Sequence, residues 1–192
     1  MQTRAAKATL KQTAPDTLLP SAALSVPRKS IRYYQWLDKP PEVGDVAYGT
    51  VRYLGFHKTL ENKQGRIHAV NDGSRSVFVF GNRYAPDSFE GFVPEQITAQ
   101  IDMLARSGIV GQLTRKNVNV KDPTRVELHG YICDESGLVL NTRRCPLIKD
   151  PRTTKKIRRR SPMILVVGTS MNSGKSMAAA SICWALSTMG YK

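Results

Sequence analysis

The most constraining feature of the chain is a glycine-containing segment near its C-terminal end, placed between an apolar run and an uncharged helical pattern. Residues 163–167 read Met-Ile-Leu-Val-Val without alternation, which is typical of a strand buried on both faces of a parallel sheet. Residues 175–189 carry apolar side chains at helical spacing, and Gly190 follows as a stop signal. We therefore predict a β–loop–α unit, the start of an α/β domain, over residues 162–192.

The loop between these two elements has the residue types that hold phosphate groups. It reads GTSMNSGKS from Gly168 to Ser176. Small residues let backbone N–H groups converge on an anion, and a helix that begins at Gly174 points its positive dipole end at that anion. Lys175 is predicted to reach the β- and γ-phosphates as the catalytic cation, and the Ser176 hydroxyl to ligate Mg²⁺. The predicted backbone cradle consists of Gly168, Thr169, Asn172, Ser173 and Gly174.

The spacing within the loop departs from the usual phosphate-loop pattern. Five residues separate Gly168 from Gly174, and Thr169 stands where a glycine is expected. This arrangement resembles the loop of dethiobiotin synthetase and its relatives, which belong to the SIMIBI class of P-loop NTPases. Residues 169–175, followed by the alanines at 178–180, are also similar to an uncharacterised bacterial P-loop family.

The resemblance covers residues 163–192 only. It implies ATP and Mg²⁺ as cofactors, a parallel sheet and usually a homodimer. Ser170 occupies the position of the extra signature lysine of the partition-type members, so a partition ATPase is disfavoured. ATP and GTP both stay open as the nucleotide, and the substrate is not indicated.

Residues 42–144 are predicted to form a β-rich accessory domain. Strand patterns occur near residues 46–54, 76–80, 109–114 and 126–132. Residues 94–106 instead place Ile97, Ile101 and Leu104 at helical spacing, which predicts one covering helix. The predicted fold class is α+β: a barrel-like domain with one covering helix, followed by the β–loop–α unit of a parallel-sheet domain. A flexible basic arm is expected over residues 1–41 and a basic linker over 145–161.

The acidic residues stop at Asp150. A complete P-loop site needs a further carboxylate that helps to hold Mg²⁺. We therefore expect the chain to be the N-terminal part of a longer ATP-dependent NTPase, kinase or ligase, and to be inactive by itself.

The net charge of +14, from 29 basic and 15 acidic residues, attracts anions in general. The stretch from Arg143 to Arg160 holds many of these cations but only one acid, Asp150. The alternative function is therefore a module in which the β-rich domain and this basic run bind nucleic acid or an acidic partner. Nucleic acid is the less favoured partner, because no aromatic residue lies within the basic run.

The remaining features favour an ordinary cytoplasmic protein. The sequence has neither an apolar run long enough to span a membrane nor the apolar core of a secretory signal at its start, so no membrane partner is expected. Cys133, Cys145 and Cys183 are expected to be reduced thiols. The three histidines are isolated from other metal ligands, which leaves Ser176 as the one predicted metal ligand.

Overall fold

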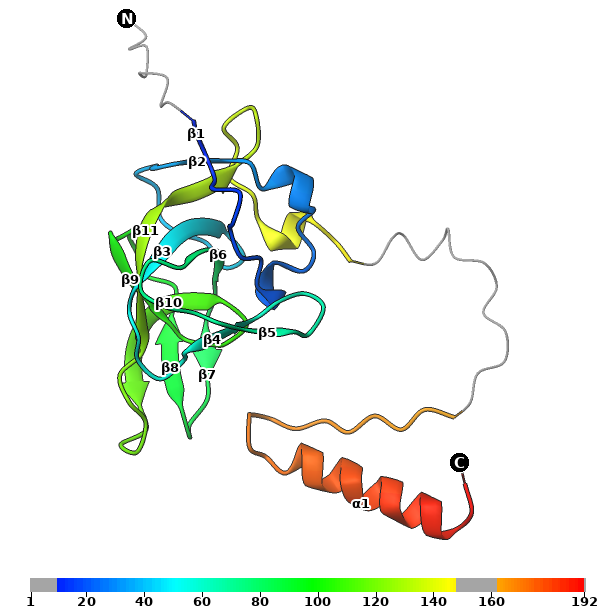
Figure 1. Cartoon of the computed structure of the whole chain (residues 1–192). Coiled ribbons are helices and arrows are strands. Elements are labelled where there is room, and N and C mark those ends of the chain that lie inside the picture. The colour runs from blue at the N-terminus through cyan, green and yellow to red at the C-terminus, as the bar shows by residue number, and fades with distance from the viewer. Residues whose placement is uncertain (1–9, 148–161, 192) are drawn as a thin grey trace, which may run out of the picture.

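The computed structural model describes residues 10–147 and 162–191, and it shows a β-barrel domain and one α-helix (Figure 1). The strands are β1 (Lys11–Gln12), β2 (Tyr33–Gln35), β3 (Val46–Tyr53), β4 (Thr59–Glu61), β5 (Ile67–Ala69), β6 (Arg75–Phe80), β7 (Arg83–Tyr84), β8 (Phe89–Phe92), β9 (Gln100–Met103), β10 (Ile109–Lys116) and β11 (Thr124–Cys133). The helices are η1 (Ser21–Ala23), η2 (Arg28–Ser30), η3 (Thr142–Arg144) and α1 (Lys175–Thr188), of which the first three are 3-10 helices.

Five of the strands close into a ring. Strand β3 pairs in antiparallel fashion with β6 on one side and β11 on the other. Strand β6 pairs in parallel with β10. Strand β9 pairs with both β10 and β11 and so completes the barrel. Closure leaves these five strands without the free backbone edge that an open sheet would expose.

The covering helix predicted over residues 94–106 is absent, because this segment contains strand β9 instead. Ile101 and Met103 are buried while Asp102 between them is only partly so. The same segment therefore fits both a strand repeat and a helical repeat. The strand forms because β9 gains backbone hydrogen-bond partners on both sides, from β10 and β11. The segment therefore closes the barrel wall rather than covering it.

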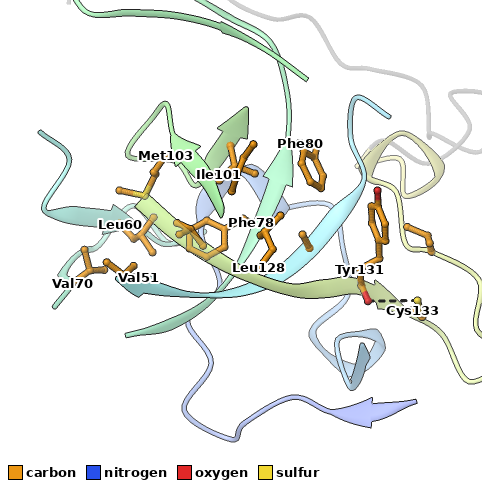
Figure 2. Close-up of a cluster of buried hydrophobic side chains, with 14 residues drawn as sticks. Val51, Leu60, Val70, Phe78, Phe80, Ile101, Met103, Leu128, Tyr131 and Cys133 are labelled. Carbon is orange, nitrogen blue, oxygen red and sulfur yellow. Dashed lines mark hydrogen bonds between the residues drawn. The ribbon is translucent and has the colours of Figure 1, made fainter. Parts of the chain in front are cut away.

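The barrel interior is filled by large apolar side chains from every strand of the ring (Figure 2). Phe78 and Phe80 of β6 are fully buried there, beside Tyr131 of β11. Burying each such side chain contributes on the order of 1.5–3 kcal/mol. The interior cluster also contains Ala47, Val51, Leu60, Val70, Ile101, Met103, Val110, Val126, Leu128, Cys133 and Val139.

The outer face of β3 and β6 is buried as well, because residues 10–41 pack against it. Ala23, Val26 and Ile31 from this segment form a second cluster with Val77 and Val79 of β6. Strand β2 also pairs with β11, and β1 pairs with β2. The described part of the expected flexible arm, residues 10–41, is thus an integral layer of the domain.

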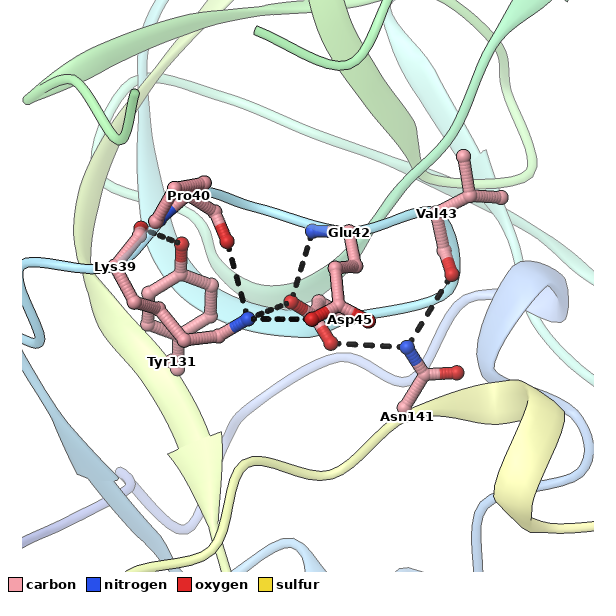
Figure 3. A network of polar contacts seen from close by, with 7 residues as sticks. All are labelled: Lys39, Pro40, Glu42, Val43, Asp45, Tyr131 and Asn141. Carbon is pink, nitrogen blue, oxygen red and sulfur yellow. Dashed lines mark hydrogen bonds and ion pairs between the residues drawn. The ribbon is translucent and has the colours of Figure 1, made fainter. Parts of the chain in front are cut away.

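The buried carboxylate of Asp45, directly before β3, links this part of the chain to Asn141 near the end of the domain (Figure 3). Asp45 accepts hydrogen bonds from the Lys39 ammonium at 2.8 Å, the Glu42 backbone N–H at 3.0 Å and the Asn141 amide at 2.9 Å. The Tyr131 hydroxyl donates to the backbone carbonyl of Lys39 at 2.9 Å. Every contact satisfies a buried polar group, as burial of a charge requires.

The predicted strand at residues 163–167 is also absent. These residues have no regular secondary structure, and Met163 and Leu165 are each about four-fifths exposed. A strand needs hydrogen-bonding neighbours, and no strand of the described chain lies beside this segment. The predicted α+β fold class is therefore wrong: the described chain combines a mixed β-barrel, with no covering helix, and the single helix α1, with no parallel sheet around the loop.

Candidate phosphate-binding loop

The sign of the backbone φ alternates within the loop from Gly168 to Ser176. Asn172 has a φ of 62° and Gly174 a φ of 85°, whereas Ser173 and Lys175 have negative φ. Alternation between right- and left-handed conformations turns successive N–H groups toward a common side and makes a concavity that binds anions. Asn172 is the only residue other than glycine with positive φ in the described ranges, and asparagine tolerates this conformation better than most residues.

The helix that follows the loop begins with free donors. Its N-cap residue, Gly174, supplies no side-chain hydrogen bond, and the first turn contains no acidic residue. The first backbone bond of the helix runs from the Ala178 N–H to the Gly174 carbonyl at 2.9 Å. The N–H groups of residues 175–177 precede that bond and point out of the helix end, where the helix dipole favours an anion.

Lys175 folds back over the loop. Its ammonium donates to the Ser170 carbonyl at 2.5 Å and to the Ser173 hydroxyl at 3.1 Å. Its aliphatic part lies against Gly168, where a Cβ would come within 3.0 Å of the Lys175 Cγ. Gly168 thus leaves the space that lets the lysine curl across the loop. The cation is held at the loop by neutral oxygens.

The predicted site residues do not all line one hollow. A hollow of about 270 Å³ is lined by Asn172, Gly174, Lys175, Ser176 and Met177. Ser173 belongs to the same turn and contacts Lys175. Gly168 and Thr169 do not line the hollow.

One carboxylate outside the loop contacts it. The Asn172 side-chain amide donates to Asp87, which lies in the turn between β7 and β8. Sequence pattern alone could not select Asp87, because it lies 85 positions away from Asn172. A contact between residues so far apart in the sequence depends on tertiary structure, and no local sequence pattern indicates it.

Two of the strand cations are paired with acids: Arg52 contacts Glu127 at 2.7 Å and Lys116 contacts Asp122 at 2.5 Å. These pairs hold the pKa of each carboxyl below its usual range, because the cation stabilises the ionised form. The basic run at residues 154–160 lies outside the described residues.

Comparisons with known proteins give no family for this chain: no protein-family model, no curated protein and no solved structure matches it. Within residues 10–147 and 162–191, no group of three or more histidine, cysteine, aspartate or glutamate side chains could hold a metal ion. None of the helices described there is long and apolar enough to cross a membrane.

Proposed function

We propose that the loop at residues 168–176 binds the phosphate groups of a nucleoside triphosphate, with ATP the first candidate. The observation that carries this proposal is the alternating handedness at residues 172–175, directly before an uncapped helix N-terminus. The N–H groups of such a turn and of the first helical turn act together on one anion.

The side chains of the loop fit the same ligand. Within the described residues, the Lys175 ammonium is bound only by uncharged oxygens of the loop, so an incoming phosphate can take their place and gain a charge-assisted hydrogen bond. Ser176 follows immediately, in the first turn of α1 and in the wall of the hollow. Its hydroxyl is the oxygen that would hold Mg²⁺, a cation that prefers oxygen ligands and usually bridges phosphates.

The proposal predicts separate losses for the two side chains. Lys175→Ala should weaken binding of a fluorescent ATP analogue at least tenfold, because a charge-assisted hydrogen bond contributes about 1.5–3 kcal/mol. Ser176→Ala should remove most of the stimulation of binding by Mg²⁺. Ser181→Ala is the matched control, since Ser181 is an exposed serine farther along the same helix.

Titration of the full chain with the analogue, with and without Mg²⁺, measures both effects. Unchanged affinity in Lys175→Ala would rule out the loop as the phosphate site. An equal loss of Mg²⁺ stimulation in Ser176→Ala and Ser181→Ala would rule out Ser176 as a metal ligand.

A further inference from the structure

The barrel contains a second group of polar side chains whose hydrogen-bonding capacity is not fully used, on residues outside the loop. In the described residues, two buried side-chain polar atoms lack a hydrogen-bond partner: Arg83 Nε and Ser88 Oγ. Both belong to the hairpin formed by β7 and β8. A buried donor without a partner costs about 1–3 kcal/mol, so the Arg83 guanidinium is incompletely paired within the described chain.

The guanidinium of Arg83 and the ring of His57 meet at one backbone oxygen. Arg83 Nη1 donates to the Leu104 carbonyl, and His57 Nε2 lies 3.0 Å from the same oxygen. A carbonyl oxygen can only accept, so the proton of the neutral ring is on Nε2 and the lone pair is on Nδ1. Arg83 Nη2 and His57 Nδ1 have no partner within the described chain, and neither is among its buried unpartnered atoms. Both nitrogens therefore reach solvent.

The charged side chains that act on the His57 ring are both cationic. Arg83 is half-buried and forms no ion pair with a described residue. The charged groups that act on His57 are Arg83 and Arg106, and burial together with these cations lowers the pKa of His57 to about 4. A partly buried guanidinium without a carboxylate is costly, because its lost hydration is not compensated.

An aromatic wall borders the same place. The His57 ring packs edge-on against Phe56 and Phe89, with ring centroids 5.0 and 5.6 Å away. Phe56 and Phe89 also contact each other edge-on. Such rings limit the access of water on one side and strengthen the electrostatic attraction of an anion to the cations.

We propose that Arg83 and His57 form an oxyanion site beside the β7–β8 hairpin, with Arg106, two residues after Leu104, as a further cation, and that its ligand is a dianion of the phosphate class. A guanidinium presents a planar fork of donors that matches phosphate oxygens. Two arginines without a carboxylate favour a double negative charge over a single one. The hydroxyl of a hydrogen phosphate donates to the lone pair of His57 Nδ1, while its charged oxygens accept from Arg83 Nη2 and are attracted by the Arg106 cation.

Inorganic phosphate tests this site in the full chain carrying Lys175→Ala, so that the loop does not compete. The reporter is the His57 ring, followed by its proton and nitrogen resonances. Phosphate should produce a saturable shift, and Arg83→Gln should weaken the binding at least tenfold. Arg66→Gln is the matched control, because Arg66 is an exposed arginine on the β4–β5 hairpin without a described ion pair.

Two further anions test the assigned chemistry at equal ionic strength. Sulfate lacks the hydroxyl that His57 Nδ1 accepts from and should bind more weakly than phosphate, and acetate should bind more weakly still. Acetate binding as tight as phosphate binding would overturn the dianion assignment.

Equal phosphate affinity in the Arg83→Gln and Arg66→Gln chains would overturn the site itself. If Arg83→Gln does not fold, Arg106→Gln replaces it, because Arg106 is exposed. That substitution should weaken phosphate binding at least threefold, and an unchanged affinity would equally overturn the proposal.

Discussion

The barrel and the C-terminal segment differ in how their apolar residues are used. In the barrel, β3 and β6 are buried on both faces, by the interior cluster on one side and by residues 10–41 on the other. Helix α1 buries none of its residues, and Trp184 on it is 72% exposed. The barrel is therefore stabilised mainly by tertiary packing, whereas the described helix depends on its local backbone hydrogen bonds.

The difference shows why the same residue pattern gives two outcomes. Residues 76–80 and 163–167 are both short and mainly apolar. The first is a strand because β3 and β10 supply its backbone partners, and the second is not, because no described strand lies next to it. An apolar run favours burial, but the segments that lie next to it determine which secondary structure it adopts.

The largest difference between the two regions should appear on truncation of a large side chain. Phe78→Ala, in the fully buried interior, should lower the free energy of unfolding of the barrel by about 3–5 kcal/mol, because it leaves a cavity. Trp184→Ala removes a larger side chain from α1 but should change that free energy by less than about 0.5 kcal/mol. Urea unfolding followed by circular dichroism measures both. A comparable loss in the two variants would show that the helix packs on the barrel.

The Asp45 network provides a smaller contrast within the barrel. Asp45→Ala should destabilise the domain by roughly 2–3 kcal/mol, since it leaves the Glu42 N–H without its acceptor and removes one of the two hydrogen bonds that the Asn141 amide donates. Asp16→Ala is the matched control, because the Asp16 carboxylate is largely exposed and lies 3.8 Å from Arg75. Its loss should cost less than about 1 kcal/mol. Equal midpoints of thermal unfolding for the two variants would contradict a structural role for the network.

The pH dependence of the barrel should give the smallest of these effects. The folded state lowers the pKa of His57 to about 4 from an ordinary value of 6.5. Between these values the unfolded chain binds more protons, so this contribution to stability is present above pH 6.5 and is lost as the pH falls toward 4. The ring is partly exposed, so we expect a loss of roughly 1–2 kcal/mol. Unfolding at pH 7 and pH 4.5 measures it, and His57→Gln should remove this part of the dependence.

Much of the barrel wall was predictable from local pattern. The strand expected near residues 46–54 is observed as β3, and those near 109–114 and 126–132 lie within β10 and β11. The strand β9 was not predictable, because Ile101 lies on a helical repeat with Leu104 and on a strand repeat with Met103 at the same time. Only the two neighbouring strands decide between the repeats.

The candidate sites divide in the same way. The residues from Asn172 to Ser176 are adjacent in sequence, so their grouping could be predicted from spacing and residue type. The Arg83 and His57 side chains meet only through the carbonyl of Leu104, which is 47 positions from His57 and 21 from Arg83. No local pattern connects them, and His57 alone gives no sign of a binding site.

The most direct test of the phosphate-binding loop compares two glycines in binding of the ATP analogue with Mg²⁺. Gly174 and Gly190 have nearly the same left-handed φ, 85° and 84°, and a Cβ would meet no atom within 4 Å at either position. Alanine therefore imposes the same backbone cost, about 1–2 kcal/mol, at both sites, but only Gly174 belongs to the alternating turn. The account predicts that Gly174→Ala weakens nucleotide binding five- to tenfold while Gly190→Ala leaves it within twofold. Equal affinities in the two variants would contradict it.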